Sequence, residues 1–319
     1  MLESTPISAS SATEVVRPTA ERAGLIRRIF RSEWLLFLLF VGPNLLLFGI
    51  FTYYPMVYSG YLSLVKWDLL SPTKEWVGLE NYQDLFTDDT FQQVLRNTFV
   101  FTAGAVGGSL VLGLLIALLL NQPLRGRDSA RAIVFAPTLL SGAAIGIVWV
   151  YIFDPRYGLM NQVLEWVHLP TPDRWLRDPK MAMVAVIIVY IWKNLGFAAV
   201  IFLAGLQGIP KDLYEAAKID GAGVFNRFWT VTVPMLSPIS FFLLVTSILN
   251  TFQSFDIIQV MTAGGPVDGT NTLVYYIYEQ GFVNFNAGDA AASAIILFVI
   301  MLGITLIQMR YAERKVHYG

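Results

Sequence analysis

Residues 214–238 read YEAAKIDGAGVFNRFWTVTVPMLSP and lie within a polar stretch, 207–234, that separates two hydrophobic runs. Pro210 suits the first turn of a helix, where its missing N–H costs nothing. The following segment, 211–219, is rich in the helix formers Ala, Leu, Glu and Lys. Gly221 adopts a left-handed conformation without strain and can end that helix. The stretch therefore predicts a short helix and a glycine turn between two long apolar segments.

Outside this stretch, the chain contains six hydrophobic runs, each long enough to cross a membrane. The runs are at 34–54, 97–120, 132–153, 181–206, 239–260 and 290–308. About 20 apolar residues span the roughly 30 Å of hydrocarbon in a bilayer, and backbone groups in hydrocarbon must be satisfied within helices or closed barrels. We therefore expect an all-α membrane protein with six transmembrane helices, comprising a tail at 1–33, a membrane domain at 34–309 and a tail at 310–319.

The composition favours a membrane protein without a catalytic centre. Of the 319 residues, 55% are hydrophobic and 14% are charged, whereas soluble domains carry about 25% charged residues. The net charge of −1 argues against a nucleic-acid partner. The chain has no Cys and only two His, so we expect no metal site. It also lacks a phosphate-binding Gly-x-x-x-x-Gly-Lys-Ser/Thr motif and a credible Ser/His/acid arrangement, so we expect neither catalysis nor a bound cofactor.

The distribution of Lys and Arg predicts which loops face the cytoplasm. Counted from the expected spans, one set of loops and tails holds twice as many Lys and Arg residues as the other. The basic set is 1–33, 121–131, 207–233 and 309–319, and the other set is 55–96, 154–180 and 261–289. Because basic loops stay in the cytoplasm, both termini and the 207–234 loop are expected on that side.

Polar residues inside the fourth and fifth runs are candidates for a solute path. Lys193 lies in the fourth run and Asp256 in the fifth, and an uncompensated charge in the bilayer costs roughly 2.5–3.5 kcal/mol. Asn250 and Gln253 are spaced to share one face of a helix over the fifth run, with Ser254 and Asp256 beside them. These five residues either line a path for solute or make hydrogen bonds between helices. Lys193 can also anchor the fourth helix by pairing with a carbonyl or a carboxylate.

The spaced pattern of Glu215-Ala216-Ala217, Gly221 and Val231-x-Val233-Pro234 resembles the "EAA" loop in the membrane subunits of ATP-binding-cassette importers. Val233 is a departure, since the pattern usually has Leu there, but the change is conservative. Other segments resemble the carbohydrate-uptake permeases of this family, and the likeness covers about 34–315. These segments are VGLENY at 77–82, GLLIALLLN at 113–121, IWKNLGF at 191–197, LAGLQ at 203–207 and GGP at 264–266.

The resemblance implies a type I importer fold with a cytoplasmic coupling helix in the bacterial cytoplasmic (inner) membrane. Two homologous permease subunits would form the solute path through the lipid bilayer. Two ATPase subunits, which carry the ATP and Mg, would dock under the EAA loops, and an extracytoplasmic binding protein would deliver a small-molecule solute. The implied coupling residues are Glu215, Ala216, Ala217, Asp220, Gly221 and Pro234.

Two segments bear on the substrate. PISFFLL at 238–244 and RYAERKVHY at 310–318 resemble the glycerol-phosphate permeases of this family, which implies sn-glycerol-3-phosphate or a glycerophosphodiester. A neutral di- or oligosaccharide stays open, because Lys193 is the only basic residue within the expected spans and the fifth run offers amides that suit sugars. A membrane-embedded transferase would need an acidic or histidine constellation that the sequence lacks. A secondary transporter would not be expected to carry an EAA loop.

Overall fold

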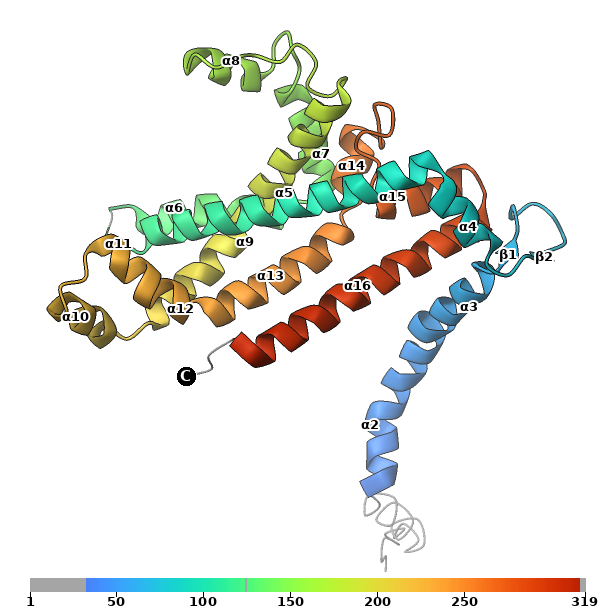
Figure 1. Cartoon of the computed structure of the whole chain (residues 1–319), viewed down its shortest axis with the longest axis horizontal. Helices are drawn as coiled ribbons and strands as arrows, with labels where there is room; N and C mark the ends of the chain where they lie inside the picture. Colours follow the sequence, from blue (N-terminus) through green and yellow to red (C-terminus); the bar gives the residue numbers. More distant parts are fainter. Residues whose placement is uncertain (1–32, 124, 316–319) are drawn as a thin grey trace, which may run out of the picture. The chain divides into compact units, whose positions relative to one another are not determined.

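The computed structural model describes residues 33–123 and 125–315. The predicted tail at 1–33 therefore lies almost wholly outside the described residues, as does the end of the tail at 310–319. Within the described ranges the regular secondary structure is helical apart from one short antiparallel ribbon, in which Val65 pairs with Trp76 and Lys66 with Glu75 (Figure 1). The chain divides into two units, Met1–Tyr58 and Ser59–Gly319.

The helices and strands occur in the following order. They are α2 (Glu33–Phe48), the π-helix η1 (Gly49–Tyr53), α3 (Tyr54–Leu62), β1 (Val65–Lys66), β2 (Glu75–Trp76), α4 (Glu80–Thr87), α5 (Asp89–Leu120), α6 (Arg127–Phe135), the 3₁₀ helix η2 (Ala136–Leu139), α7 (Gly142–Ile152), α8 (Leu159–Trp166), α9 (Pro179–Gly208), α10 (Lys211–Ile219), α11 (Val224–Arg227), the π-helix η3 (Phe228–Thr232), α12 (Val233–Met235), α13 (Ser237–Phe252), α14 (Asp256–Met261), α15 (Leu273–Tyr278), the π-helix η4 (Glu279–Val283) and α16 (Ala287–Lys315).

Four helices in the described ranges are long and apolar enough to cross a membrane, and two bent pairs raise the number to six if each pair is one span. The four are Leu36–Leu62, Asp89–Leu120, Pro179–Gly208 and Ala287–Arg310. One bent pair joins Arg127–Leu139 to Gly142–Ile152 at 104°, and the other joins Val224–Met235 to Ser237–Phe252 at 63°. Several apolar helices of membrane-spanning length are therefore present, as the hydropathy predicts.

The third hydrophobic run, 132–153, is not the continuous helix that we expected from its composition. Helix α6 ends at Phe135, and Pro137 lies in the 3₁₀ turn that follows. A proline inside an α-helix removes a backbone donor and clashes with the preceding turn, which favours the end of α6 at this point. Ser141 then starts α7 as its N-cap, its Oγ accepting from the Ala144 N–H at 3.3 Å.

The fifth run, 239–260, is also interrupted, which corrects the prediction of a single polar face. Helix α13 ends at Phe252, the Ser254 N–H closes a turn on the Thr251 carbonyl at 3.1 Å, and α14 begins at Asp256. An acidic residue in the first turn favours a helix start. Asn250 and Asp256 consequently lie on different helices, so the polar residues of 239–260 do not share one continuous helix face.

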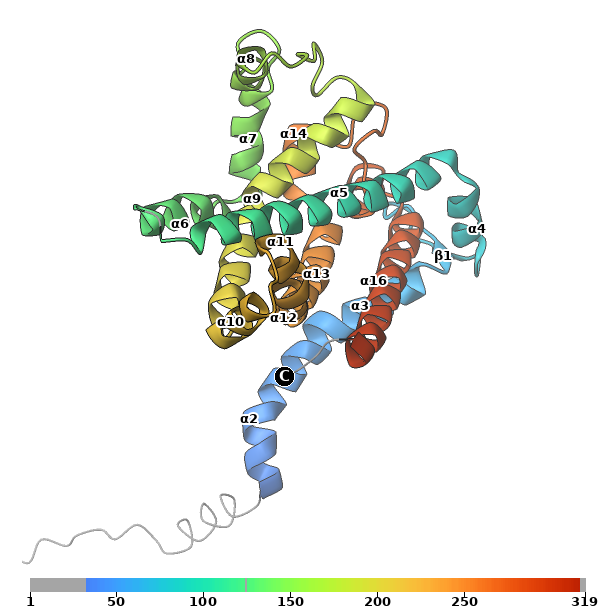
Figure 2. The same ribbon diagram turned by 60° about the vertical axis from the view of Figure 1, so that its left-hand side comes forward.

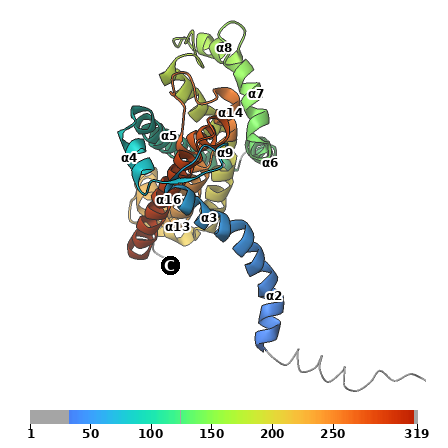
Figure 3. The same cartoon turned by 90° about the vertical axis from the view of Figure 1, so that its right-hand side faces the viewer.

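The centre of the second unit is the contact between α5 and α9, which have the same chain direction and cross each other (Figures 1 and 2). Small residues allow the close approach: a Cβ added at Gly104 would lie 2.9 Å from Ile187 Cδ1, and one at Gly113 would lie 2.7 Å from Ala198 Cβ. Figures 1 and 2 show α10, α11 and α12 at one end of this unit and α4 at the other. Figure 3 shows α13 and α16 on the same side of the unit. The polar stretch at 207–234 thus forms a structure of its own at one end of the helices.

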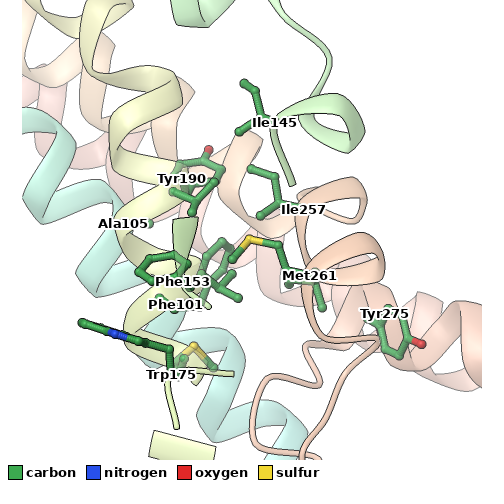
Figure 4. Close-up of a cluster of buried hydrophobic side chains, with 14 residues drawn as sticks. Phe101, Ala105, Ile145, Phe153, Trp175, Tyr190, Ile257, Met261 and Tyr275 are labelled. Atoms are coloured by element: carbon green, nitrogen blue, oxygen red, sulfur yellow. The ribbon is translucent and has the colours of Figure 1, made fainter. Parts of the chain in front are cut away.

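A buried cluster attaches the two half-helices α7 and α14 to this centre (Figure 4). Phe101 of α5 and Tyr190 of α9 meet edge to face, with ring centroids 5.3 Å apart. Ile145 of α7 and Ile257 of α14 belong to the same cluster and are almost fully buried. Burial of this kind contributes about 25 cal/mol per Å² of apolar surface, so the breaks in the third and fifth runs are held by packing.

Candidate functional site

Helix α10 ends in a hydrogen-bonded glycine turn. It spans Lys211–Ile219, as the composition predicts, and Pro210 precedes it with extended ψ of 132°. At its other end Gly221 has φ +80°, its N–H bonds to the Lys218 carbonyl at 3.1 Å, and the Ala222 N–H bonds to the Ala217 carbonyl at 2.9 Å. These two bonds define a Schellman cap, and only glycine adopts the left-handed conformation there without strain.

A side-chain contact ties α10 to the segment that follows. The Tyr214 hydroxyl lies 3.0 Å from Thr232 Oγ1 in η3, and Thr232 is buried. Ala217, one turn after Tyr214, is half-buried on the same side of the helix. This face of α10 therefore rests on the protein, which fixes the direction in which the other faces point.

The remaining faces of α10 and its neighbour α11 are exposed. Among the predicted coupling residues, Glu215, Ala216 and Asp220 are exposed. Large apolar side chains are exposed beside them: Ile219 is 86% and Phe225 77% accessible. An exposed apolar patch rimmed by charge is typical of a surface that interacts with a protein or a membrane. The structure therefore brings Glu215, Ala216, Ala217, Asp220 and Gly221 together on one projecting element.

Pro234 occupies a different position from the other predicted coupling residues. It lies in the first turn of α12, where its missing N–H is tolerated, and it is exposed. The 63° bend between Val224–Met235 and Ser237–Phe252 follows directly after α12. Pro234 belongs to the bend that joins the projecting element to α13.

The five predicted path residues are not gathered into one site within this chain. Lys193 is half-buried on α9, and its backbone carbonyl accepts from Thr138 Oγ1 at 3.0 Å, which ties η2 to α9. Asn250 and Gln253 are exposed near the end of α13, and neither side chain makes a hydrogen bond to a described residue. Ser254 is buried at the break.

Asp256 contacts the start of the other broken helix. Its carboxylate lies directly against Gly142, where any added Cβ would collide with it. Gly142 is the first residue of α7, so the carboxylate lies at the positive end of that helix dipole, where a negative charge is favoured. Asp256 therefore contacts α7 at its first residue, and its carboxylate accepts from the Ile257 N–H at 3.0 Å.

Two glycines in or beside the broken third run, Gly142 and Gly196, carry close contacts between helices. Besides Gly142, Gly196 of α9 lies against α6, where an added Cβ would be 2.7 Å from Phe135 Cα. The signal for Gly142 was present, because Ser141 and the small residues after it indicate a packed helix start. No local pattern distinguishes Gly196, whose partner is more than fifty residues away in the sequence.

A polar cavity of about 470 Å³ lies in the loop between α7 and α9. Its lining includes Arg156, Arg174 and Arg177, together with Trp175 and the carboxylates of Asp154 and Asp173. The Arg156 backbone N–H, 2.8 Å from Asp154 Oδ1, lowers the pKa of that carboxyl below its usual range. Asp154 is thus engaged in its own turn, and the three guanidinium groups make no ion pair with any described residue. The cavity therefore carries three guanidinium groups and two carboxylates, a small excess of positive charge.

Comparisons with known proteins agree with this arrangement. Residues 109–318 match the family described as "Binding-protein-dependent transport system inner membrane component". The chain is 36% identical over 292 residues to the sn-glycerol-3-phosphate transport system permease protein UgpA of Agrobacterium fabrum, covering 91% of this chain and 99% of the relative. The corresponding protein of Pectobacterium atrosepticum is 35% identical over 298 residues, covering 92% of this chain and 98% of the relative.

Solved structures of one transporter are also similar. A chain of a bacterial ABC transporter that imports the acidic polysaccharide alginate has a TM-score of 0.75 and 26% identity, covering 92% of this chain and 100% of the other. A second structure contains that transporter in complex with a periplasmic protein bound to an alginate pentasaccharide; it has a TM-score of 0.77 and 25% identity, covering 92% and 99%.

Proposed function

This chain belongs to the family of binding-protein-dependent transport system inner membrane components, and we propose that it imports a glycerol phosphate as one of two homologous permease subunits. Membership makes it a permease subunit of an ATP-binding-cassette importer and not itself an enzyme. It works with an extracytoplasmic binding protein and the other subunits of a transporter. The observation that carries the substrate proposal is the 36% identity to glycerol-3-phosphate permeases over nearly the whole chain.

The proposed topology has six spans, with each bent pair counted as one, and both termini in the cytoplasm. The excess of Lys and Arg in one set of loops supports this orientation. Under this topology α10 faces the cytoplasm, whereas the loop with the arginine-lined cavity faces outside. The binding protein would then dock on the outer loops and deliver solute there.

Helix α10 is proposed as the coupling helix. A projecting helix with exposed Glu215 and Ala216, an exposed apolar Ile219 and a rigid glycine cap suits a groove on an ATPase subunit. Two such ATPase subunits would carry the ATP and Mg, so this chain would need no cofactor of its own. Closure of the ATPases would push α10, and the helices attached to it would move as rigid bodies between inward- and outward-facing states.

Asn250 and Gln253 are the proposed path residues with the strongest support. Both are exposed in the isolated chain and make no hydrogen bond to a described residue, so their amides are free to contact solute in the assembled transporter. Ser254 and Asp256 belong to the same break, and Asp256 would act mainly by holding α14 against α7. Lys193 is the remaining candidate, as a cation for an anionic solute.

The proposed substrate is sn-glycerol-3-phosphate or a glycerophosphodiester, and the second candidate is a neutral di- or oligosaccharide. The similar alginate transporter shows that this fold serves saccharides as well. Competition uptake in cells that carry the whole system distinguishes the two candidates. We expect glycerol-3-phosphate or glycerophosphocholine to inhibit uptake. Inhibition by trehalose or maltose, with none by either phosphate ester, would contradict the proposal and favour a neutral saccharide as the substrate.

A further inference from the structure

A groove separates α5 from α9 at the end where both helices begin. It encloses about 710 Å³. The two helices touch closely further along, at Gly104 and Gly113, and diverge toward their N-termini (Figures 1 and 2). The groove therefore opens at one edge of the apolar part of both helices.

The position of two cations in this groove matches the boundary of a bilayer. Arg96 of α5 and Lys180 of α9 both line it. Arg96 comes directly before the hydrophobic run 97–120, and Lys180 comes directly before the run 181–206. Basic side chains at such positions extend their charge into the headgroup layer.

Backbone carbonyls fix the three side-chain amides of the groove. The side-chain amide of Gln92 donates to the Phe86 carbonyl at 3.0 Å, that of Gln93 to the Val267 carbonyl at 3.0 Å, and that of Asn97 to the Asp268 carbonyl. The charged groups that line the groove are therefore its two cations.

The charge of the groove is uniformly positive. No acidic side chain lines it, and in the described part of the chain neither Arg96 nor Lys180 has an ion-pair partner. The nearest carboxylate in sequence, Asp178, accepts instead from the backbone N–H groups of Lys180 and Met181, both at 3.0 Å. An anion is therefore the complementary ligand.

Below the cations the wall of the groove is apolar. It is formed by Val100, Met183, Val184 and Ile187, of which Val100 and Val184 are 47% and 43% accessible. A free phosphate ester has no part that would use this wall, whereas the acyl chain of a lipid does. A ligand with an anionic head and an apolar tail satisfies both halves of the groove.

We propose that this groove binds an anionic phospholipid, with its phosphate on Arg96 and Lys180 and an acyl chain along Val184 and Ile187. The proposal needs only the location of the chain in a membrane, so it does not depend on the identity of the transported solute. Its readout is lipid binding, which stays measurable whether or not the substrate proposal holds.

The test is native mass spectrometry of the full chain, purified in mild detergent with the subunits that copurify, during titration with phosphatidylglycerol or phosphatidylcholine. The test variant is Arg96→Gln/Lys180→Gln, and the matched control, Arg174→Gln/Arg177→Gln, removes two cations from the loop before α9. Each basic residue near an anionic headgroup changes affinity about fivefold. We therefore expect phosphatidylglycerol binding to fall by about tenfold or more in the test variant and to stay unchanged in the control.

A second variant, Val184→Trp, fills the apolar wall and keeps both cations. It should also reduce phosphatidylglycerol binding, because the acyl chain loses its place. Equal retention of phosphatidylglycerol by the wild type and both groove variants would overturn the proposal. Displacement of the lipid by millimolar sn-glycerol-3-phosphate would also overturn it, because the groove would then be a solute site. Loss of a copurifying subunit from the groove variants would overturn it as well, because the groove would then be a protein interface.

Discussion

Replacing Gly221 by valine tests the role of α10 with a perturbation whose physical effect is confined to one turn. Gly221 has φ +80°, and a Cβ added there meets nothing within 4 Å. The substitution therefore creates no clash, and its cost is the left-handed backbone conformation alone. The backbone strain at residue 221 destabilises the Schellman cap that the Gly221 and Ala222 N–H groups form.

The magnitude of the effect follows from that conformation. An L-residue in the left-handed region costs about 1–2 kcal/mol relative to glycine, and a β-branched residue belongs at the upper end of the range. A cost of about 2 kcal/mol lowers the equilibrium constant for forming the capped turn by about thirtyfold. If an ATPase subunit binds only the capped form of α10, its affinity falls in proportion to the fraction of capped turn that is lost, by at most that factor. Gly221→Asn, which tolerates this region better, should lose much less.

The assay compares ATP-driven uptake with the amount of chain in the membrane for wild type, Gly221→Val and Gly221→Asn. We expect normal membrane insertion of all three, severe loss of uptake with an uncoupled or released ATPase for valine, and a mild loss for asparagine. Normal transport by Gly221→Val at normal membrane levels would refute the reasoning. An equal and complete loss for both variants would show that backbone strain is not the cause.

Three further predictions concern the path, the broken helices and the outer loop. Asn250→Ala and Gln253→Ala should weaken uptake and leave assembly and basal ATPase activity intact, because neither side chain forms a hydrogen bond to a described residue. If copurification shows that the variants lose assembly instead, the two side chains act in hydrogen bonds between helices. Gly142→Ala should lower the thermal unfolding midpoint of the purified chain, since overpacking costs about 1–3 kcal/mol. The control Gly107→Ala should not lower it, because nothing lies within 4 Å of the added Cβ. Equal unfolding midpoints for the two variants would contradict the contact between Gly142 and α14. Arg174→Glu should reduce stimulation of the ATPase by the binding protein severalfold, and unchanged stimulation would exclude that side chain from the docking surface.

Local signals in the sequence predicted α10 well. Its sequence carries a proline before the helix, good helix formers within it and a glycine after it, and each of these acts over a few residues. Helix α10 consequently begins at Lys211 and its cap lies at Gly221, as expected. Hydropathy likewise identified the segments that contain the long apolar helices.

The breaks in the third and fifth runs could not be read in the same way. Hydropathy measures whether a segment prefers hydrocarbon and does not show whether its helix is continuous. Pro137 was a signal for the first break, but the position of α7 depends on the distant contact between Gly142 and Asp256. The single polar face predicted for the fifth run failed for the same reason, because helical spacing was counted across the break after Phe252.

The cationic groove between α5 and α9 was also beyond sequence reasoning. Arg96 and Lys180 are more than eighty residues apart and lie in different expected loops. Only the packing of the two helices against each other brings them together. Residues that act through tertiary contact leave no spacing pattern in the chain.

The central claim is that this chain forms part of an ATP-driven importer for a glycerol phosphate. Its most direct test is uptake of radiolabelled sn-glycerol-3-phosphate by proteoliposomes that contain this chain, the second permease subunit and the ATPase, with the binding protein outside and ATP inside. We predict accumulation that requires ATP, the binding protein and an intact α10. Accumulation without ATP or the ATPase, or uptake of trehalose or maltose with none of glycerol-3-phosphate, would contradict the account.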